Sequence, residues 1–189
     1  MINPSRALNM EEYIERVMRA AAERKGEPVF NGSIDHARVI ATAMFKHARK
    51  SVDIFSCDLN ARVYGPDHVL DEAEFFLANK DHKVRVLLEK IPENDGTKHP
   101  FFKRFSGYSN IETRVLDKNM AKQINFHLMV ADNDCYRFEQ DKKNVAAIAS
   151  WGDPKGGEHL KSVFETLWGW GEAVATSNPA KRMAMKEYE

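Results

Sequence analysis

Strand-like and helix-like segments alternate along most of this chain, and the alternation restricts the folds open to it. Short apolar segments typical of β-strands occupy residues 51–57, 83–88 and 111–116. Between them, apolar residues recur every three or four positions, as on the buried face of an amphipathic helix. Strands and helices that alternate at this spacing form βαβ units with parallel neighbouring strands. We therefore predict an α/β fold with a mixed, mostly parallel sheet flanked by helices.

The last third of the chain follows a different pattern. Residues 126–132 and 135–139 are strand-like and flank Asn133-Asp134, a dipeptide typical of tight hairpin turns. Residues 145–151 add another strand, and apolar residues at helical spacing from Leu160 to Trp168 mark a closing helix. We expect this end of the sheet to be antiparallel.

The chain divides by pattern into three parts. Its first amphipathic helix begins after Asn9, an N-cap candidate with Glu12 at the capping-box position, and ends before Gly26. A polar tail follows the closing helix and either forms a short helix or remains disordered. The parts are an N-terminal helix in residues 1–27, an α/β domain in residues 28–175 and a tail in residues 176–189.

Composition and charge exclude several classes of protein. The 28 basic residues equal the 28 acidic residues, so no overall field attracts a nucleic acid or an anionic membrane. No apolar segment reaches the ~18 residues of a membrane span, and residues 1–6 do not resemble a signal peptide. We expect a cytoplasmic protein. Cys57 and Cys135 lack zinc or redox spacing, so we expect no metal, cofactor or disulfide.

Residues 126–134 carry the most informative motif. His127 and Asp134 are separated by six residues, and Met129 lies two residues after the histidine. The segment resembles the phospholipase D superfamily motif His-x-Lys-x-x-x-x-Asp, with methionine in place of lysine. The order of the elements and the segment from Phe164 to Trp168 extend the resemblance over roughly residues 28–172.

The resemblance implies a specific chemistry. In that family one histidine attacks phosphorus, a second histidine protonates the leaving oxygen, and lysines hold the phosphate oxygens. Two copies of the motif are therefore needed, and this chain has one. An active form would resemble the small bacterial nucleases, in which His127 of two subunits would meet across a two-fold axis. The resemblance thus implies a homodimer, with His127 and Asp134 at the catalytic positions.

Two departures from the family pattern weigh against catalysis. Met129 has neither a charge nor a hydrogen-bond donor, and loss of one such contact typically raises a barrier by ~3–4 kcal/mol. The family also has a Gly-Ser turn and an asparagine after its motif, whereas residues 136–144 lead directly to the next strand. Both losses affect groups that hold phosphate. Lys142 or Lys143 is a candidate replacement for the missing cation.

Each candidate residue also has a structural explanation. His127 is either a vestigial histidine beside the core or a retained reactive or ligand-binding group. Asp134 is either a turn former or a catalytic remnant, and Met129 is expected to pack in the core. Asp58 and Asn60 follow a strand at the carboxyl end of the sheet, where α/β folds bind ligands, but both residues are also common in turns.

Residues 98–122, which are rich in basic and aromatic side chains, form a second candidate binding region. Phenylalanines at 101, 102 and 105 lie among its cations, a combination that can bind single-stranded nucleic acid through phosphate contacts and base stacking. The alternative is that the phenylalanines are core residues and the cations a solvated surface. The candidate nucleic-acid residues are Lys98, Lys103, Arg104, Lys118 and Lys122.

Three functions remain open from the sequence. The favoured one is a degenerate, non-catalytic phospholipase D-like domain that serves in binding, regulation or assembly and recognises phosphate or nucleic acid. The enzymatic alternative is a metal-independent phosphodiesterase or nuclease that uses paired His127 residues and a relocated lysine. The third is a structural subunit that contacts a protein partner through its N-terminal helix or its tail.

Overall fold

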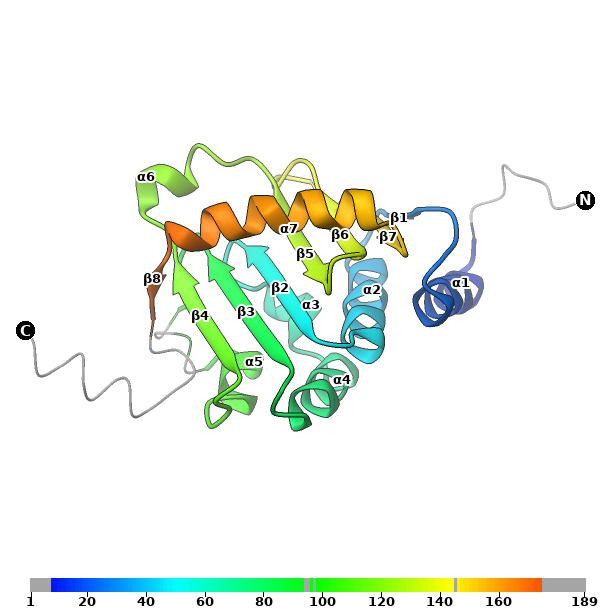
Figure 1. Cartoon of the computed structure of the whole chain (residues 1–189), viewed down its shortest axis with the longest axis horizontal. Helices are drawn as coiled ribbons and strands as arrows, with labels where there is room; N and C mark the ends of the chain where they lie inside the picture. The colour runs from blue at the N-terminus through cyan, green and yellow to red at the C-terminus, as the bar shows by residue number, and fades with distance from the viewer. Residues whose placement is uncertain (1–7, 94–95, 97, 145, 175–189) are drawn as a thin grey trace, which may run out of the picture.

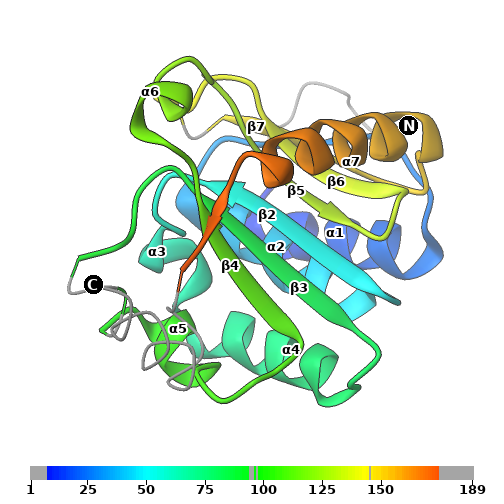
Figure 2. The same cartoon turned by 60° about the vertical axis from the view of Figure 1, so that its left-hand side comes forward.

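A mixed sheet of eight strands lies between two layers of helices in the computed structural model of the chain, which describes residues 8–93, 96, 98–144 and 146–174 (Figures 1 and 2). The elements follow one another in this order: α1 (Met10–Glu23), β1 (Val29–Asn31), α2 (Ile34–His47), β2 (Ser51–Ser56), α3 (Ala61–Tyr64), α4 (Asp67–Ala78), β3 (Lys83–Leu88), α5 (Pro100–Arg104), β4 (Ile111–Val115), α6 (Lys118–Ala121), β5 (His127–Ala131), β6 (Cys135–Glu139), β7 (Ala147–Trp151), α7 (Pro154–Gly169) and β8 (Glu172–Ala173).

The sheet is mixed, as the sequence predicts, but it is not mostly parallel. Its strand order is β1-β7-β6-β5-β2-β3-β4-β8. Among the described residues, only β2–β3 and β3–β4 pair in parallel, and the other five pairings are antiparallel. Helical crossovers follow β2 and β3, whereas short connections join β5, β6 and β7 and therefore turn the chain back on itself.

Helices cover the two faces of the sheet unequally. The helix α7 crosses one face, whereas α1, α2, α4 and α5 cover the other (Figures 1 and 2). The larger core lies on the side of α2 and α4 and includes Phe45, Phe76 and Phe101. The smaller core, on the side of α7, is built around Phe55 and Phe164. Each strand residue therefore belongs to one of two separate cores.

Local sequence signals place several helix ends correctly. Asn9 and Glu12 form the predicted capping box of α1, and the Ser33 side chain caps α2. The segment after β2 contains the short helix α3, and the Asn60 side chain caps this helix by accepting a hydrogen bond from the Arg62 backbone N–H. The predicted tail, residues 176–189, lies outside the described residues.

The helix α1 is fixed to the sheet by Arg24. This residue ends α1 in a left-handed conformation, with φ +49°. Its guanidinium pairs with the side chains of Asp132 and Asp134 and donates to the His47 carbonyl at 3.0 Å. Asp132 also accepts hydrogen bonds from the backbone N–H groups of residues 49–51. The end of α1, the end of α2 and the β5–β6 turn are thereby held together.

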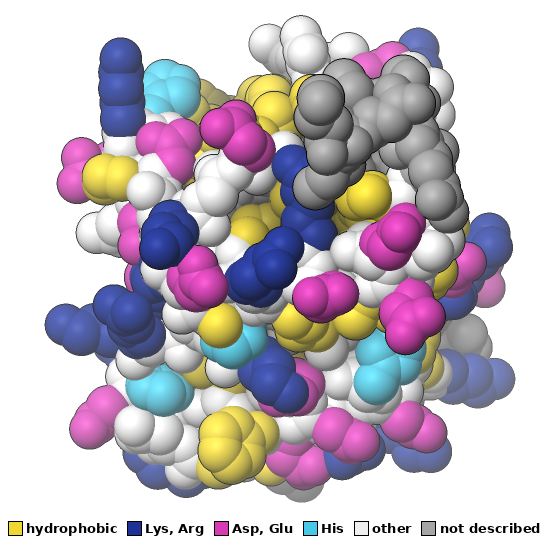
Figure 3. Space-filling view, turned by 90° about the vertical axis from the view of Figure 1, so that its right-hand side faces the viewer, with side chains coloured by type: hydrophobic (Ala, Val, Ile, Leu, Met, Phe, Trp, Pro, Cys, Tyr) yellow, Lys and Arg dark blue, Asp and Glu magenta, His cyan; other side chains and the backbone are white. Residues whose placement is uncertain are grey.

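No helix among the described residues is long and apolar enough to cross a membrane. On the face that carries α1, acidic and basic side chains are interspersed with single hydrophobic ones (Figure 3). This face therefore presents no large patch of one charge.

Candidate functional site

His127 begins β5 at the end of the sheet where the parallel strands terminate. Because β5 runs antiparallel to β2, its first residue lies beside the carboxyl end of β2. The imidazole packs edge-to-face against Phe55, with 5.6 Å between ring centroids, and its side chain is 12% exposed. The sequence therefore places His127 where open α/β sheets usually bind ligands.

Two carboxylates hold the imidazole from opposite sides. His127 Nδ1 lies 3.3 Å from Glu139 Oε1, and His127 Nε2 lies 3.2 Å from Glu89 Oε1. A carboxylate only accepts hydrogen bonds, so both contacts are satisfied when the ring carries two protons. Burial opposes charge on this histidine, but the hydrogen bonds to Glu139 and Glu89 outweigh burial and raise its pKa. The site therefore favours the imidazolium.

Two cations extend this arrangement into a network. Lys142 Nζ donates to Glu89 Oε1 at 2.9 Å, and Arg137 Nη2 donates to Glu139 Oε2 at 2.8 Å. Burial disfavours both carboxylates, yet hydrogen bonds from His127 and from these cations lower the pKa of each glutamate. We call Lys142, Glu89, His127, Glu139 and Arg137 the His127 network. It alternates positive and negative charge along its whole length.

Met129 lies in the core beside this network. Its side chain is 1% exposed, and the Tyr64 hydroxyl lies 3.8 Å from its sulfur. Burial raises the pKa of Tyr64 to about 12, so this hydroxyl stays protonated. Arg137 is the cross-strand partner of Met129 and brings its guanidinium to Glu139. The position of the family's lysine is apolar here, and the nearest cation on the neighbouring strand is Arg137.

All members of the network except Glu89 line a cavity of about 180 Å³. Typical small-molecule sites exceed about 300 Å³, so this cavity accommodates a small group or one end of a larger ligand. Predicted residues on its wall are Asp58, Asn60, His127, Lys142 and Lys143.

Two of these wall residues also have local roles. Asn60 caps α3, and Asp58 lies 3.4 Å from Lys90 in an ion pair. The structure therefore brings the predicted ligand residues together with His127, although these two also serve the loop itself.

Asp134, the last residue of the motif, lies at the other end of β5. A strand rises about 3.3 Å per residue, so the turn that contains Asp134 is about 16 Å or more from His127. Asp134 instead pairs with Arg24, and its carbonyl accepts a hydrogen bond from the Asp153 N–H. Its contacts are those of a residue that stabilises the turn.

Residues 33–177 match the model of a domain of unknown function (DUF7931). The chain belongs to this family. No curated protein sequence matches the DUF7931 chain.

Solved structures show what kind of fold this is. Nuc from Salmonella typhimurium, a phospholipase D family member, has a TM-score of 0.51 and 17% identity, with 78% of this chain and 98% of Nuc covered. NucT from Helicobacter pylori has a TM-score of 0.55 and 15% identity, with 78% of this chain and 98% of NucT covered. The archaeal chromatin protein TrmBL2, whose structure shows a mode of DNA binding, has a TM-score of 0.57 and 16% identity. The DUF7931 chain is covered over 85% of its length and spans 60% of TrmBL2. The fold is phospholipase D-like.

The predicted nucleic-acid residues do not form one surface in the DUF7931 chain. Lys103 and Arg104 lie on α5 and Lys118 on α6, and these helices flank opposite ends of β4 (Figures 1 and 2). Arg104 pairs with Asp71 and Glu74. The three phenylalanines of the segment are at most 1% exposed, which confirms the alternative that they are core residues, so they are not available to stack on bases.

Part of that basic segment lies beside the His127 network. Lys142 Nζ donates to the Ala121 carbonyl at 3.1 Å, which places α6 at the rim of the cavity. Lys143 is exposed on the wall of this cavity, and Lys118 and Lys122 are exposed at the two ends of α6. Lys98 is also exposed, but it precedes α5.

The possible metal ligands and the two thiols of the described residues lie as follows. No group of three or more histidine, cysteine, aspartate or glutamate side chains among these residues is arranged to hold a metal. Burial raises the pKa of the Cys135 thiol to about 12, and burial also raises the pKa of Cys57. Neither thiol is therefore activated as a nucleophile.

Glu89, Glu139 and Arg137 are the residues that the sequence analysis missed. Glu139 had a detectable signal, because a hairpin centred on Asn133 places it opposite His127. Glu89 directly follows the predicted strand 83–88, but its contact with His127 depends on the order of the strands in the sheet.

Proposed function

We propose that this chain is a non-catalytic phospholipase D-like module that binds the phosphate groups of a nucleic acid. The observation that carries the non-catalytic part is the contact of 3.2 Å between His127 Nε2 and Glu89. A histidine that attacks phosphorus needs one unprotonated nitrogen open to the substrate, with its other nitrogen oriented by a hydrogen bond. Here Glu139 takes the orienting position, and Glu89 takes the position of the substrate.

Electrostatics support the same conclusion. A phosphodiester that approached His127 Nε2 would meet the negative charge of Glu89, in a pocket that is mostly shielded from water. The hydrogen bonds to Glu139 and Glu89 raise the pKa of His127 and thus favour the protonated ring, which has no free lone pair with which to attack phosphorus. Met129 adds no cation where the family has one.

The rim of the cavity supports a binding role. Lys143 is exposed on the wall of the cavity, Lys118 and Lys122 are exposed at the ends of the neighbouring helix α6, and each of the three can contact a phosphate. Such contacts act locally and do not require a net positive charge on the whole chain. The DNA-binding mode of TrmBL2, which has a similar fold, makes nucleic acid the first partner to examine.

The binding part is tested with fluorescently labelled single-stranded and double-stranded DNA. We expect anisotropy to report binding that weakens with salt, and the charge reversals Lys118→Glu and Lys122→Glu to lower both the affinity and the salt dependence. Lys103→Glu is the matched control, because Lys103 is exposed on α5, away from this rim. Equal losses in all three variants would remove the assignment to the rim.

A metal-independent phosphodiesterase remains the second candidate, and Arg137 favours it. Its guanidinium lies on the strand beside Met129 and lines the same cavity as His127, so it is a possible substitute for the family's lysine. This version requires a homodimer that pairs two His127 side chains. We expect no hydrolysis of bis-p-nitrophenyl phosphate or DNA with or without EDTA; turnover lost in His127→Ala would establish the enzyme and refute the non-catalytic proposal.

A further inference from the structure

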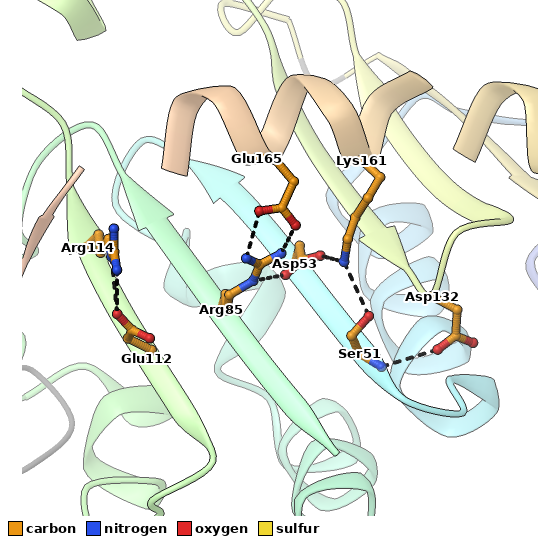
Figure 4. Close-up of polar contacts among 8 residues, drawn as sticks. All are labelled: Ser51, Asp53, Arg85, Glu112, Arg114, Asp132, Lys161 and Glu165. Atoms are coloured by element: carbon orange, nitrogen blue, oxygen red, sulfur yellow. Dashed lines mark hydrogen bonds and ion pairs between the residues drawn. The ribbon is translucent and has the colours of Figure 1, made fainter. Parts of the chain in front are cut away.

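A second cavity lies at the other end of the sheet from His127, between α7 and the first residues of β2, β3 and β4 (Figure 4). Its volume is about 490 Å³, within the range of about 300–1,000 Å³ that is typical of small-molecule sites. Ser51, Lys83 and Ile111, the first residues of these three strands, line it together with Lys161 and Trp168 from α7. It is large enough for a whole metabolite, unlike the His127 cavity.

A buried ion cluster forms one side of this cavity. Asp53 is completely buried in the middle of β2, and its carboxylate binds Arg85 Nε at 2.6 Å and the Lys161 ammonium (Figure 4). Arg85 also donates to both oxygens of Glu165, at 3.0 and 2.6 Å. An isolated carboxylate at such a site would be strongly unfavourable. Asp53 therefore holds two cations in place on the sheet.

These two cations retain donors beyond those contacts. A guanidinium has five N–H groups and an ammonium has three. Arg85 directs one N–H to Asp53 and two to Glu165, and Lys161 directs one to Asp53 and one, at 3.4 Å, to Ser51 Oγ. Both residues line the cavity. Its wall thus offers donors that are already oriented, so a ligand would not need to order them.

Asn110 contributes a side chain of fixed orientation to the lining of the cavity. Its Nδ2 atom donates to the carbonyls of Leu77, Asn79 and His82 at 3.0–3.1 Å, which defines the direction of the amide. Its Oδ1 atom has no hydrogen-bond partner within the described part of the chain, but this oxygen is buried, so a ligand in the cavity does not reach it.

The charge of the lining selects an anion. Asp53 and Glu165 balance Arg85 and Lys161, and Arg114 pairs with Glu112 at 3.0 Å. Lys83 is exposed at the edge of the cavity and is not balanced by any of these pairs. An incoming carboxylate or phosphate would neutralise it.

We propose that this cavity binds a small organic anion. Its carboxylate or phosphate group contacts the ammonium groups of Lys83 and Lys161, and its carbon skeleton lies along Trp168. This site does not depend on the function proposed for the His127 network, because it is built from other residues at the other end of the sheet.

The test uses two anions and one neutral analogue. The ¹⁵N-labelled chain is titrated with succinate, with glycerol 3-phosphate and with glycerol, and the amide signals of Ser51, Lys83 and Asn110 are followed by NMR. We expect at least one anion to shift them with a dissociation constant of about 1 mM or lower, and glycerol to leave them unchanged. A response to succinate alone or to glycerol 3-phosphate alone supports the site and identifies the anionic group.

The variant Lys83→Ala should weaken this binding about tenfold, because a charge-assisted hydrogen bond is lost. Lys83 is exposed, so the fold is retained; Lys103→Ala, an exposed lysine outside the cavity, should bind as the wild type does. The proposal is overturned if neither anion shifts these amides, if Lys83→Ala binds as tightly as the wild type, or if the shifts centre on the His127 network instead.

Discussion

Replacement of His127 by glutamine gives the sharpest test of the charged network. The imidazolium makes two hydrogen bonds to carboxylates, each worth about 1.5–3 kcal/mol, and a neutral amide retains one weaker bond of about 1 kcal/mol. The side chains of His127, Glu89 and Glu139 are only 12, 11 and 14% exposed, so solvent screens these contacts little. We expect His127→Gln to lower the free energy of unfolding by about 2–5 kcal/mol at about pH 6.

The effect should depend on pH with a definite sign. The pKa of His127 is raised in the folded chain, so its stabilising contribution is complete below the unfolded value of about 6.5 and is lost as pH rises through the folded value. The pKa values of Glu89 and Glu139 are lowered, so their contribution is present above about pH 4.5 and is lost as pH falls through their folded values. The network therefore stabilises most between about pH 5 and 6.5.

Urea unfolding followed by tryptophan fluorescence measures this difference at about pH 6 and about pH 9. The corresponding fall in melting temperature is about 4–20 °C at the lower pH, from about 2–4 °C per kcal/mol at this chain length, and this fall should be smaller at the higher pH. His159→Gln is the control, because His159 is exposed on α7 and should change stability by less than about 0.5 kcal/mol. If His127→Gln is destabilised equally at both pH values, the inference that protonated His127 stabilises the folded chain is wrong.

Three further substitutions test other parts of the structure. Arg24→Ala should cost about 3–5 kcal/mol in urea unfolding and speed hydrogen exchange in α1, whereas the exposed Arg19→Ala should do neither. Gly152→Ala should lower the free energy of unfolding in urea by more than about 2 kcal/mol, because φ is +70° and the new Cβ would lie 1.8 Å from the Arg24 carbonyl oxygen. In Gly107→Ala the new Cβ meets no atom within 4 Å, so this control should unfold as the wild type does. Met129→Lys should lower stability by about 3 kcal/mol without creating hydrolysis of a phosphodiester reporter, since it buries a charge; restored turnover would contradict this.

Elements whose signals are local were predictable from the sequence. The strand 83–88 agrees with β3 residue for residue, and the capping box of Asn9 and Glu12 marks the start of α1. The mostly parallel sheet was wrong because strand direction depends on which strands become neighbours. The strand β5 pairs with β2 in the antiparallel direction, although the two strands are about 75 residues apart in the sequence. Neither segment alone has a sequence pattern that predicts this pairing.

The candidate site shows the same limit. His127 was found from its motif, and the hairpin register could have indicated Glu139 as its neighbour. Glu89 could not be found in this way, because it reaches His127 only when β3, β2 and β5 are ordered side by side. The residue that most affects the chemistry of the histidine is therefore one that the motif does not contain.

The clamp formed by Arg24 bears on how the DUF7931 domain should be delimited. The family match begins at residue 33, after α1 and β1. A protein trimmed to residues 33–177 would lose Arg24, the partner of Asp132, and Asn31, whose side chain accepts a hydrogen bond from Arg137 at 2.9 Å. It would also expose the edge of β7 that β1 covers. The unit that folds cooperatively thus starts upstream of the unit that sequence comparison recognises, and the missing strand β1 contacts the His127 network through the bond between Asn31 and Arg137.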